Sequence, residues 1–165
     1  MNRRAATAAL GALLLVGCGA PGPEESETIA DDMRVEVHET VRTVVEGLRE
    51  RGIEVTEATG SYSACGLKTP EVEYGAGLTT TPESGSLADQ AAAATEVIES
   101  LGLPMDDDGP ENYVSTDPAE GALRVSAQET PVEPGVLAIE VVRDCEELDA
   151  DVVDERLSED AETID

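Results

Sequence analysis

The chain has 165 residues, and its 10 lysine and arginine residues against 37 aspartate and glutamate residues give a formal net charge of -27. A length of roughly 100–200 residues is typical of a single domain. The acidity excludes a nucleic-acid-binding protein, because neutralising phosphates requires clusters of lysine and arginine. The chain also lacks Trp and Phe, so it has few aromatic side chains on which bases could stack.

Residues 1–18 have the pattern of an export signal. Arg3 and Arg4 precede an apolar run over 5–16, and small residues lead from it to Cys18. This order of basic, apolar and small-residue regions is typical of a secretory signal peptide. The apolar run is shorter than the roughly 20 residues that a membrane-spanning helix needs. We therefore expect a signal peptide at 1–17, and the paired arginines leave both the Sec and the Tat export routes open.

The segment Leu15-Val16-Gly17-Cys18 resembles a lipobox. This resemblance implies diacylation of the Cys18 thiol and cleavage before it, and the alternative is an ordinary signal peptide that contains a cysteine. Two acyl chains stabilise attachment by about 0.8 kcal/mol per buried methylene, which is enough for a durable anchor. The expected location is the extracytoplasmic side of the cell membrane, with residues 18–27 as a tether. Removing residues 1–17 makes the chain more acidic, so anionic lipid headgroups should repel it.

Two further cysteines, Cys65 and Cys145, form an even pair in a chain that is expected to leave the cytosol, and they predict a disulfide. Such a bond would close a loop of about 80 residues, which contributes about 4.5 kcal/mol in the chain-entropy model. The alternative is a catalytic or metal-binding thiol. A single histidine and the lack of a CxxC motif disfavour it, so we expect no metal and no cofactor.

Helical spacing over residues 28–51 predicts the first helix, which Gly52 ends. Two strand patterns follow, one running from Ile53 towards Cys65 and one over 72–81 that two glycines interrupt. The apolar face of the helix consists of Val37, Val41, Val44 and Leu48, widened by Val45.

A second helix is predicted over 87–101, with Ser86 as its N-cap. Strands are predicted over 122–130 and 136–143, and the latter leads directly to Cys145. The order helix-strand-strand-helix-strand-strand favours a two-layer α+β sandwich in which both helices cover one face of a four-stranded, mostly antiparallel sheet. We place this single domain at 28–147. The polar segment 104–118 between its halves offers a strand only at Tyr113-Val114.

The last part of the chain, residues 148–165, is predicted to be a mobile acidic tail. Acids dominate it, and Arg156 is its single base. Val152, Val153, Leu157 and Ile164 could support a short helix, but the density of negative charge favours the mobile interpretation.

Few residues are candidates for catalysis. His38 lies beside the apolar face of the first predicted helix, and we interpret it as a flanking residue instead of a general base. No Gly-x-Ser-x-Gly motif accompanies it, and abundant surface acids hide any catalytic carboxylate pair. An acidic loop over 106–111 fails the EF-hand pattern, because Ser115 stands where a bidentate glutamate is required. A loose calcium site and a solvated loop remain the alternatives there, and we expect no catalytic residues.

A resemblance to a known family is carried by the order of these features. They are the lipobox, a helix, the segment Ser61-Tyr62-Ser63-Ala64-Cys65-Gly66, a second helix that ends at Leu101-Gly102, and a last strand that closes on Cys145. In this order the chain resembles the small LppA-type lipoproteins of actinobacteria over roughly residues 1–147. The resemblance implies an outer-leaflet lipoprotein with one disulfide, and it transfers no catalytic residue.

The function expected from the sequence is that of a lipid-anchored, non-enzymatic binding or structural module of the cell envelope. Its partners would be the membrane, through a diacylglycerol group on Cys18, and an envelope protein or small ligand of unknown identity. The alternatives are an extracellular hydrolase that uses a carboxylate pair, and a carrier of lipid or other apolar ligands, which would need a large apolar cavity.

Overall fold

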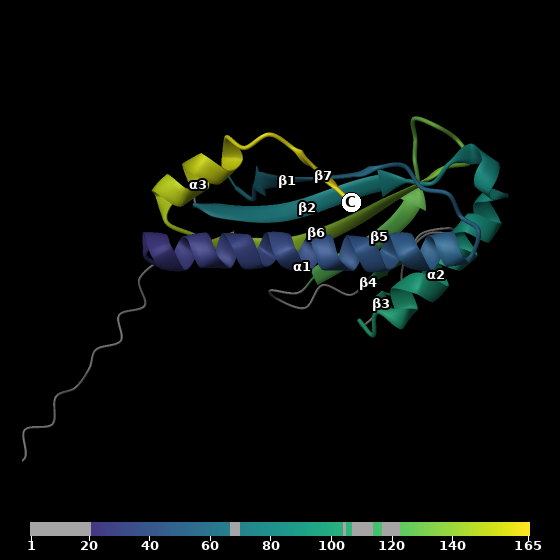
Figure 1. Ribbon diagram of the computed structural model, residues 1–165, viewed down its shortest axis with the longest axis horizontal. Coiled ribbons are helices and arrows are strands. Elements are labelled where there is room, and N and C mark those ends of the chain that lie inside the picture. The colour runs from purple at the N-terminus through teal and green to yellow at the C-terminus, as the bar shows by residue number, and fades with distance from the viewer. Residues whose placement is uncertain (1–20, 67–69, 104, 107–113, 117–122) are drawn as a thin grey trace, which may run out of the picture.

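The computed structural model describes residues 21–66, 70–103, 105–106, 114–116 and 123–165 (Figure 1). Three α-helices and seven strands occur in these residues. In chain order they are α1 (Pro23–Glu50), β1 (Ala58–Ala64), β2 (Glu71–Thr79), the 3-10 turn η1 (Pro82–Ser84), α2 (Leu87–Ser100), β3 (Met105–Asp106), β4 (Val114–Thr116), β5 (Leu123–Glu129), β6 (Leu137–Glu147), α3 (Ala150–Leu157) and β7 (Glu162–Ile164).

All the described strands belong to one antiparallel sheet in the order β3-β4-β5-β6-β2-β1-β7. The expected mixture of helices with an antiparallel sheet is confirmed, and the four long predicted strands form the middle of the sheet. The prediction of only four strands was wrong, because β3, β4 and β7 extend both edges. Each of these strands has two or three residues, which is too short to show the alternation of apolar and polar residues that identifies a strand.

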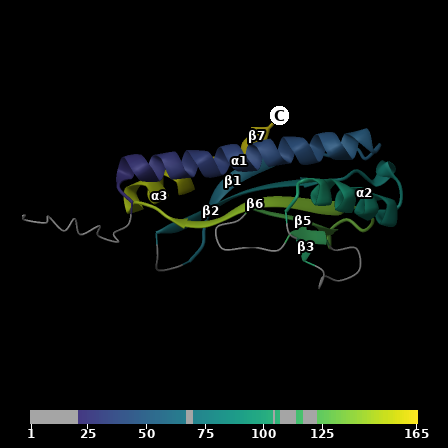
Figure 2. The same ribbon diagram turned by 90° about the horizontal axis from the view of Figure 1, so that it is seen from below.

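Helix α1 lies along the length of the sheet on one side of it, as Figure 2 shows, and packs over β2 and β6. Helix α2 packs beside it over β4 and β5. The predicted apolar face of α1 is buried, and it meets the inward-facing residues Val72, Tyr74, Ala76 and Leu78 of β2. Burying each valine or leucine contributes about 1.5–3 kcal/mol, so this interface forms a large part of a core without Phe or Trp.

The starts of α1 and β1 differ from prediction by several residues, and β6 continues to Glu147. Helix α1 begins at Pro23 instead of residue 28, so part of the predicted tether is helical. Proline is favoured in the first turn of a helix, and Glu24 and Glu25 interact favourably with the helix dipole. Strand β1 begins at Ala58, since Val55 makes only an isolated bridge to Thr80. Strand β2 continues through both of its glycines.

Residues 148–165 are folded, so the prediction of a mobile tail was wrong. Helix α3 follows the N-cap Asp149, whose side chain accepts a hydrogen bond from the Asp151 backbone N–H. Strand β7 pairs with β1 and so becomes the edge of the sheet. The apolar residues Leu148, Val152, Val153 and Ile164 are buried in the common core. Their burial outweighs the charge of the segment, and the domain therefore extends beyond residue 147.

The start of α1 is joined to the start of α3. The Ser26 hydroxyl is fully buried and accepts a hydrogen bond from the Asp149 backbone N–H at 2.8 Å. This bond fixes the first turn of the helix against the C-terminal segment. Among the described helices, none combines the length and apolar character needed to cross a membrane.

Candidate functional site

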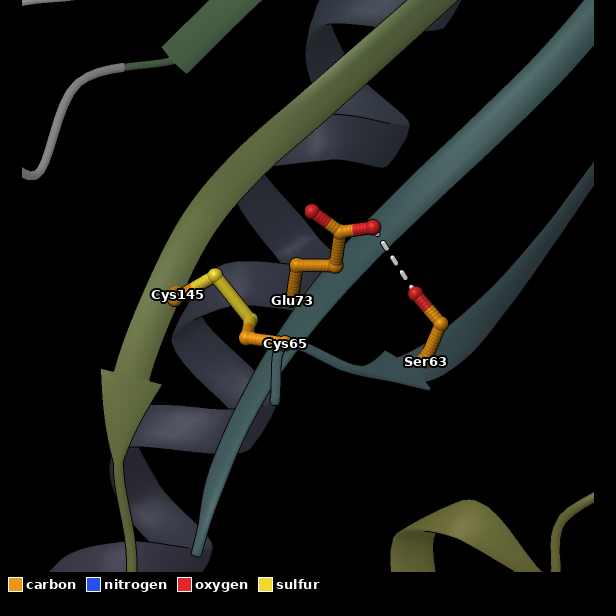
Figure 3. Close-up of a disulfide and its surroundings, with 4 residues drawn as sticks. All are labelled: Ser63, Cys65, Glu73 and Cys145. Atoms are coloured by element: carbon orange, nitrogen blue, oxygen red, sulfur yellow. Dashed lines mark hydrogen bonds between the residues drawn. A yellow bond between two sulfur atoms is a disulfide. The ribbon is translucent and has the colours of Figure 1, made fainter. Parts of the chain in front are cut away.

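The predicted disulfide is confirmed: Cys65 and Cys145 are bonded, with their Cα atoms 6.0 Å apart. The bond joins the residue after β1 to β6, and β2 lies between these two strands in the sheet (Figure 3). Glu73 of β2 lies beside the two sulfur atoms and accepts a hydrogen bond from the Ser63 hydroxyl at 2.8 Å. Because both sulfurs are bonded to each other, neither is a thiolate that could ligate a metal with Glu73.

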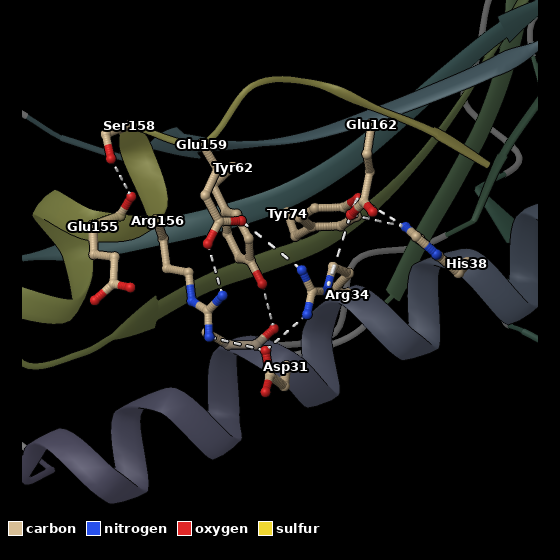
Figure 4. A network of polar contacts seen from close by, with 11 residues as sticks. Asp31, Arg34, His38, Tyr62, Tyr74, Glu155, Arg156, Ser158, Glu159 and Glu162 are labelled. Carbon is tan, nitrogen blue, oxygen red and sulfur yellow. Dashed lines mark hydrogen bonds and ion pairs between the residues drawn. The ribbon is translucent and has the colours of Figure 1, made fainter.

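His38 takes part in a polar cluster that the sequence did not predict (Figure 4). Its Nε2 atom lies 2.8 Å from the Tyr74 hydroxyl, and that hydroxyl donates to Glu162 Oε1 at 2.8 Å. Since the tyrosine proton is directed to the glutamate, His38 Nε2–H is the donor to the tyrosine oxygen. The interpretation of His38 as a flanking residue was therefore incomplete, because its side chain is only 15% exposed and joins α1 to β2 and β7.

The electrostatics of this cluster follow from burial. Desolvation lowers the pKa of His38, and Glu162 partly opposes this effect. Desolvation and the bond to Glu162 raise the pKa of Tyr74 well above its usual value. In both cases the neutral form of the side chain is favoured.

A second set of contacts continues the cluster towards α3. Arg156 forms ion pairs with Asp31 at 2.9 Å and with Glu159 at 2.8 Å, and its guanidinium lies 5.8 Å from the centre of the Tyr62 ring. Arg34 pairs with the same aspartate at 3.1 Å. The Tyr62 hydroxyl donates to a backbone carbonyl of α1, and desolvation raises its pKa to about 12. These contacts fasten the C-terminal segment to α1, which explains how so acidic a segment remains folded.

A groove of about 500 Å³ lies between the second half of α1, residues 56–58 and the end of β7. Its deeper residues are apolar: Val41, Ala58 and Ile164 are buried and Val45 is half-buried. Five charged side chains at the groove are exposed, namely Arg42, Glu46, Arg49, Glu57 and Asp165. Pockets of this volume accommodate small ligands.

The charged side chains of the groove do not pair with one another. No ion pair within 4.0 Å joins any two of them in the described part of the chain. Arg42 Nε donates to the Asp165 backbone carbonyl at 2.7 Å, which holds the end of β7 at the groove. The residues of the His38 cluster do not line this groove, so the two features are separate.

The other described hollows are smaller. One of about 230 Å³ lies between α1 and β6, where Arg143 pairs with Glu36 and Glu146 at 3.0 and 3.1 Å. Another, of about 330 Å³, lies over residues of β1, β2 and β6. The first has the paired Arg143 and the unpaired Asp32, and the second has two acids, Glu57 and Glu140, and no base among its lining residues. Neither therefore presents unpaired charges of both signs, as the groove does.

The remaining predicted sites lie largely outside the described residues. These are Cys18 with the signal peptide, and most of the acidic loop over 106–111, of which only Asp106 is described. Spacing could have revealed part of the groove, since Arg42, Glu46 and Arg49 share one face of the helix.

Comparison of the chain with family models, curated proteins and solved structures finds no match.

Proposed function

We propose that the protein is a lipoprotein anchored on the extracytoplasmic side of the cell membrane by a diacylglycerol group on Cys18, as in the LppA-type lipoproteins that it resembles. We further propose that its folded domain is a non-enzymatic binding module. The signal pattern of residues 1–17 supports the anchor. The disulfide supports the location, because such bonds persist in oxidising compartments.

The length of the tether sets the position of the domain in this proposal. Helix α1 begins at Pro23, so five residue steps separate it from Cys18. An extended chain spans at most about 3.5 Å per residue, which places the start of the helix within about 17 Å of the anchored residue. The groove lies along the second half of α1, towards the end of the helix that is far from the anchor.

The observation that carries the binding function is the groove itself, which combines an apolar interior with unpaired charged side chains of both signs. A carrier of wholly apolar molecules would enclose its ligand, whereas this groove presents charged groups at its opening. The hydrolase alternative rests on Glu46 and Glu57, which line the groove from α1 and from the segment before β1.

The anchor is tested by replacing Cys18→Ser and measuring the distribution of the protein between membrane and soluble fractions, together with labelling by radioactive palmitate. We expect the label to disappear and the protein to move to the soluble fraction, because it loses both acyl chains. Ala20→Ser, which leaves the cysteine in place, is the matched control. Membrane retention of the Cys18→Ser variant would overturn the proposed anchor.

A further inference from the structure

The charges of the groove alternate along one face of α1. Arg42, Glu46 and Arg49 are separated by four and three residues, which places them on the same side of the helix. Their Cα atoms are offset along the axis by about 6 Å and about 4.5 Å. Glu57 lies across the groove, on the segment that leads into β1.

These side chains remain unpaired, whereas four of the five other described arginines form ion pairs with described residues. Arg34, Arg51, Arg143 and Arg156 each form an ion pair within 4.0 Å. The Arg42 side chain donates only to a backbone carbonyl, and the Arg49 side chain forms no hydrogen bond or ion pair with the described residues. Residues of opposite charge at this helical spacing commonly pair, so the groove holds donors and acceptors that are open to a ligand.

We propose that the groove binds a zwitterionic dipeptide with apolar side chains, and this inference rests on the binding function proposed above. The ligand carboxylate would contact the guanidinium group of Arg49, and its ammonium group would contact Glu46 and Glu57. Its side chains would cover the apolar interior of the groove. The two termini of an extended dipeptide are about 7 Å apart, and the Cα atoms of Arg49 and Glu46 are offset by about 4.5 Å, a difference that these two long side chains can span.

A zwitterion fits better than a ligand with one charge. A free anion approaches against the field of a chain whose net charge is -27. A cation would leave the donors of both arginines unused. A ligand that carries both charges satisfies both sets of side chains and has no net charge for the field to repel.

The test is calorimetric titration of the full mature protein, lipidated and held in detergent, with three probes. They are leucyl-leucine, N-acetyl-leucyl-leucine, which lacks the ammonium group, and leucyl-leucinamide, which lacks the carboxylate. We expect leucyl-leucine to bind at least about tenfold more tightly than either analogue, because each analogue loses one charged contact. Equal affinity for the three probes, or binding of none of them, would overturn the proposed ligand class.

Substitutions inside and outside the groove test whether leucyl-leucine binds there. Arg49→Gln and Glu46→Gln should each weaken leucyl-leucine binding about fivefold or more. Glu39→Gln and Arg51→Gln make the same charge changes outside the groove and should leave the affinity unchanged. Binding that neither groove variant weakens would place the site elsewhere and overturn the inference. Hydrolysis of leucyl-leucine during the titration would instead contradict the non-enzymatic function, and membrane fractionation of Cys18→Ser tests the anchor independently of both.

Discussion

The hydroxyl of Tyr74 on β2 donates a hydrogen bond to Glu162 on β7, 88 residues later in the chain. Gly60 lies between these strands in β1, and a Cβ atom there would collide with the same hydroxyl. The tyrosine can therefore reach the last strand across its neighbour only because position 60 has no side chain. One hydroxyl thus joins the middle of the sheet to its edge and to α1.

Removal of that hydroxyl should loosen β7. We expect Tyr74→Phe to lower the free energy of unfolding by about 1–2 kcal/mol, because His38 and Glu162 each lose a partner. Amide exchange of β7 should become faster than that of β2. The comparison is Tyr62→Phe, which removes a bond to the Ala30 carbonyl but none to β7. Equal acceleration at β7 in both variants would contradict a specific role of Tyr74.

Stability should fall as the pH decreases from about 7.5 to about 5.5. Desolvation lowers the pKa of His38 in the folded protein, with contributions of the same sign from Arg42 and Arg34 against the opposing Glu162. The unfolded chain then binds the proton more readily, so stability is lost as the pH falls through the ordinary histidine range. Urea unfolding across this range measures the effect. His38→Gln should flatten the curve there, and an unchanged pH dependence in that variant would assign the effect to other groups.

The disulfide should supply a large part of the stability. The double replacement Cys65→Ser with Cys145→Ser is expected to lower the free energy of unfolding by up to about 4.5 kcal/mol, because the unfolded chain regains the freedom of a long loop. Denaturant titration of the variant, compared with the wild-type protein with and without reductant, measures the loss. Cys18→Ser is the control, since it removes a cysteine that forms no part of the bond. A double variant as stable as wild type would contradict this role.

Helices α1 and α2 approach each other closely at Gly47. A Cβ atom at this position would lie 2.9 Å from Val97 Cγ2. Glycine to alanine within a helix usually stabilises by about 1 kcal/mol, but here we expect Gly47→Ala to destabilise because the valine must move. Adding Val97→Ala should recover part of the loss, which a double-mutant cycle of melting measurements would show. Stabilisation by Gly47→Ala alone would mean that the helices separate without cost.

The sequence indicated the parts of the fold that local patterns determine. Apolar spacing identified α1, α2 and the four long strands, because each buries one regular face. It did not identify α3 and β7 as folded, since their acidity suggested a solvated tail. That error has a physical cause, because the arginines that neutralise this segment include Arg34, which is far away in the chain.

The candidate site was predictable only in part. Cys65 and Cys145 could be paired by elimination, as few cysteines were available. The contact between His38 and Glu162 could not be foreseen, because the register of β7 against β1 brings them together and three residues carry too little pattern to reveal it. The groove likewise forms from α1, the approach to β1 and the end of β7, so no single segment shows it.

The hydrogen bond between Ser26 and Asp149 affects when the core can be completed during synthesis of the chain. Helix α1 is synthesised first, but Ser26 in its first turn forms its hydrogen bond to Asp149 only after the residues at the start of α3 have been synthesised. Until then, the first turns of this 28-residue helix lack the part of their covering that α3 supplies. A nascent chain is therefore unable to complete its native core before these last residues are synthesised. That delay would keep the chain available for the export proposed above.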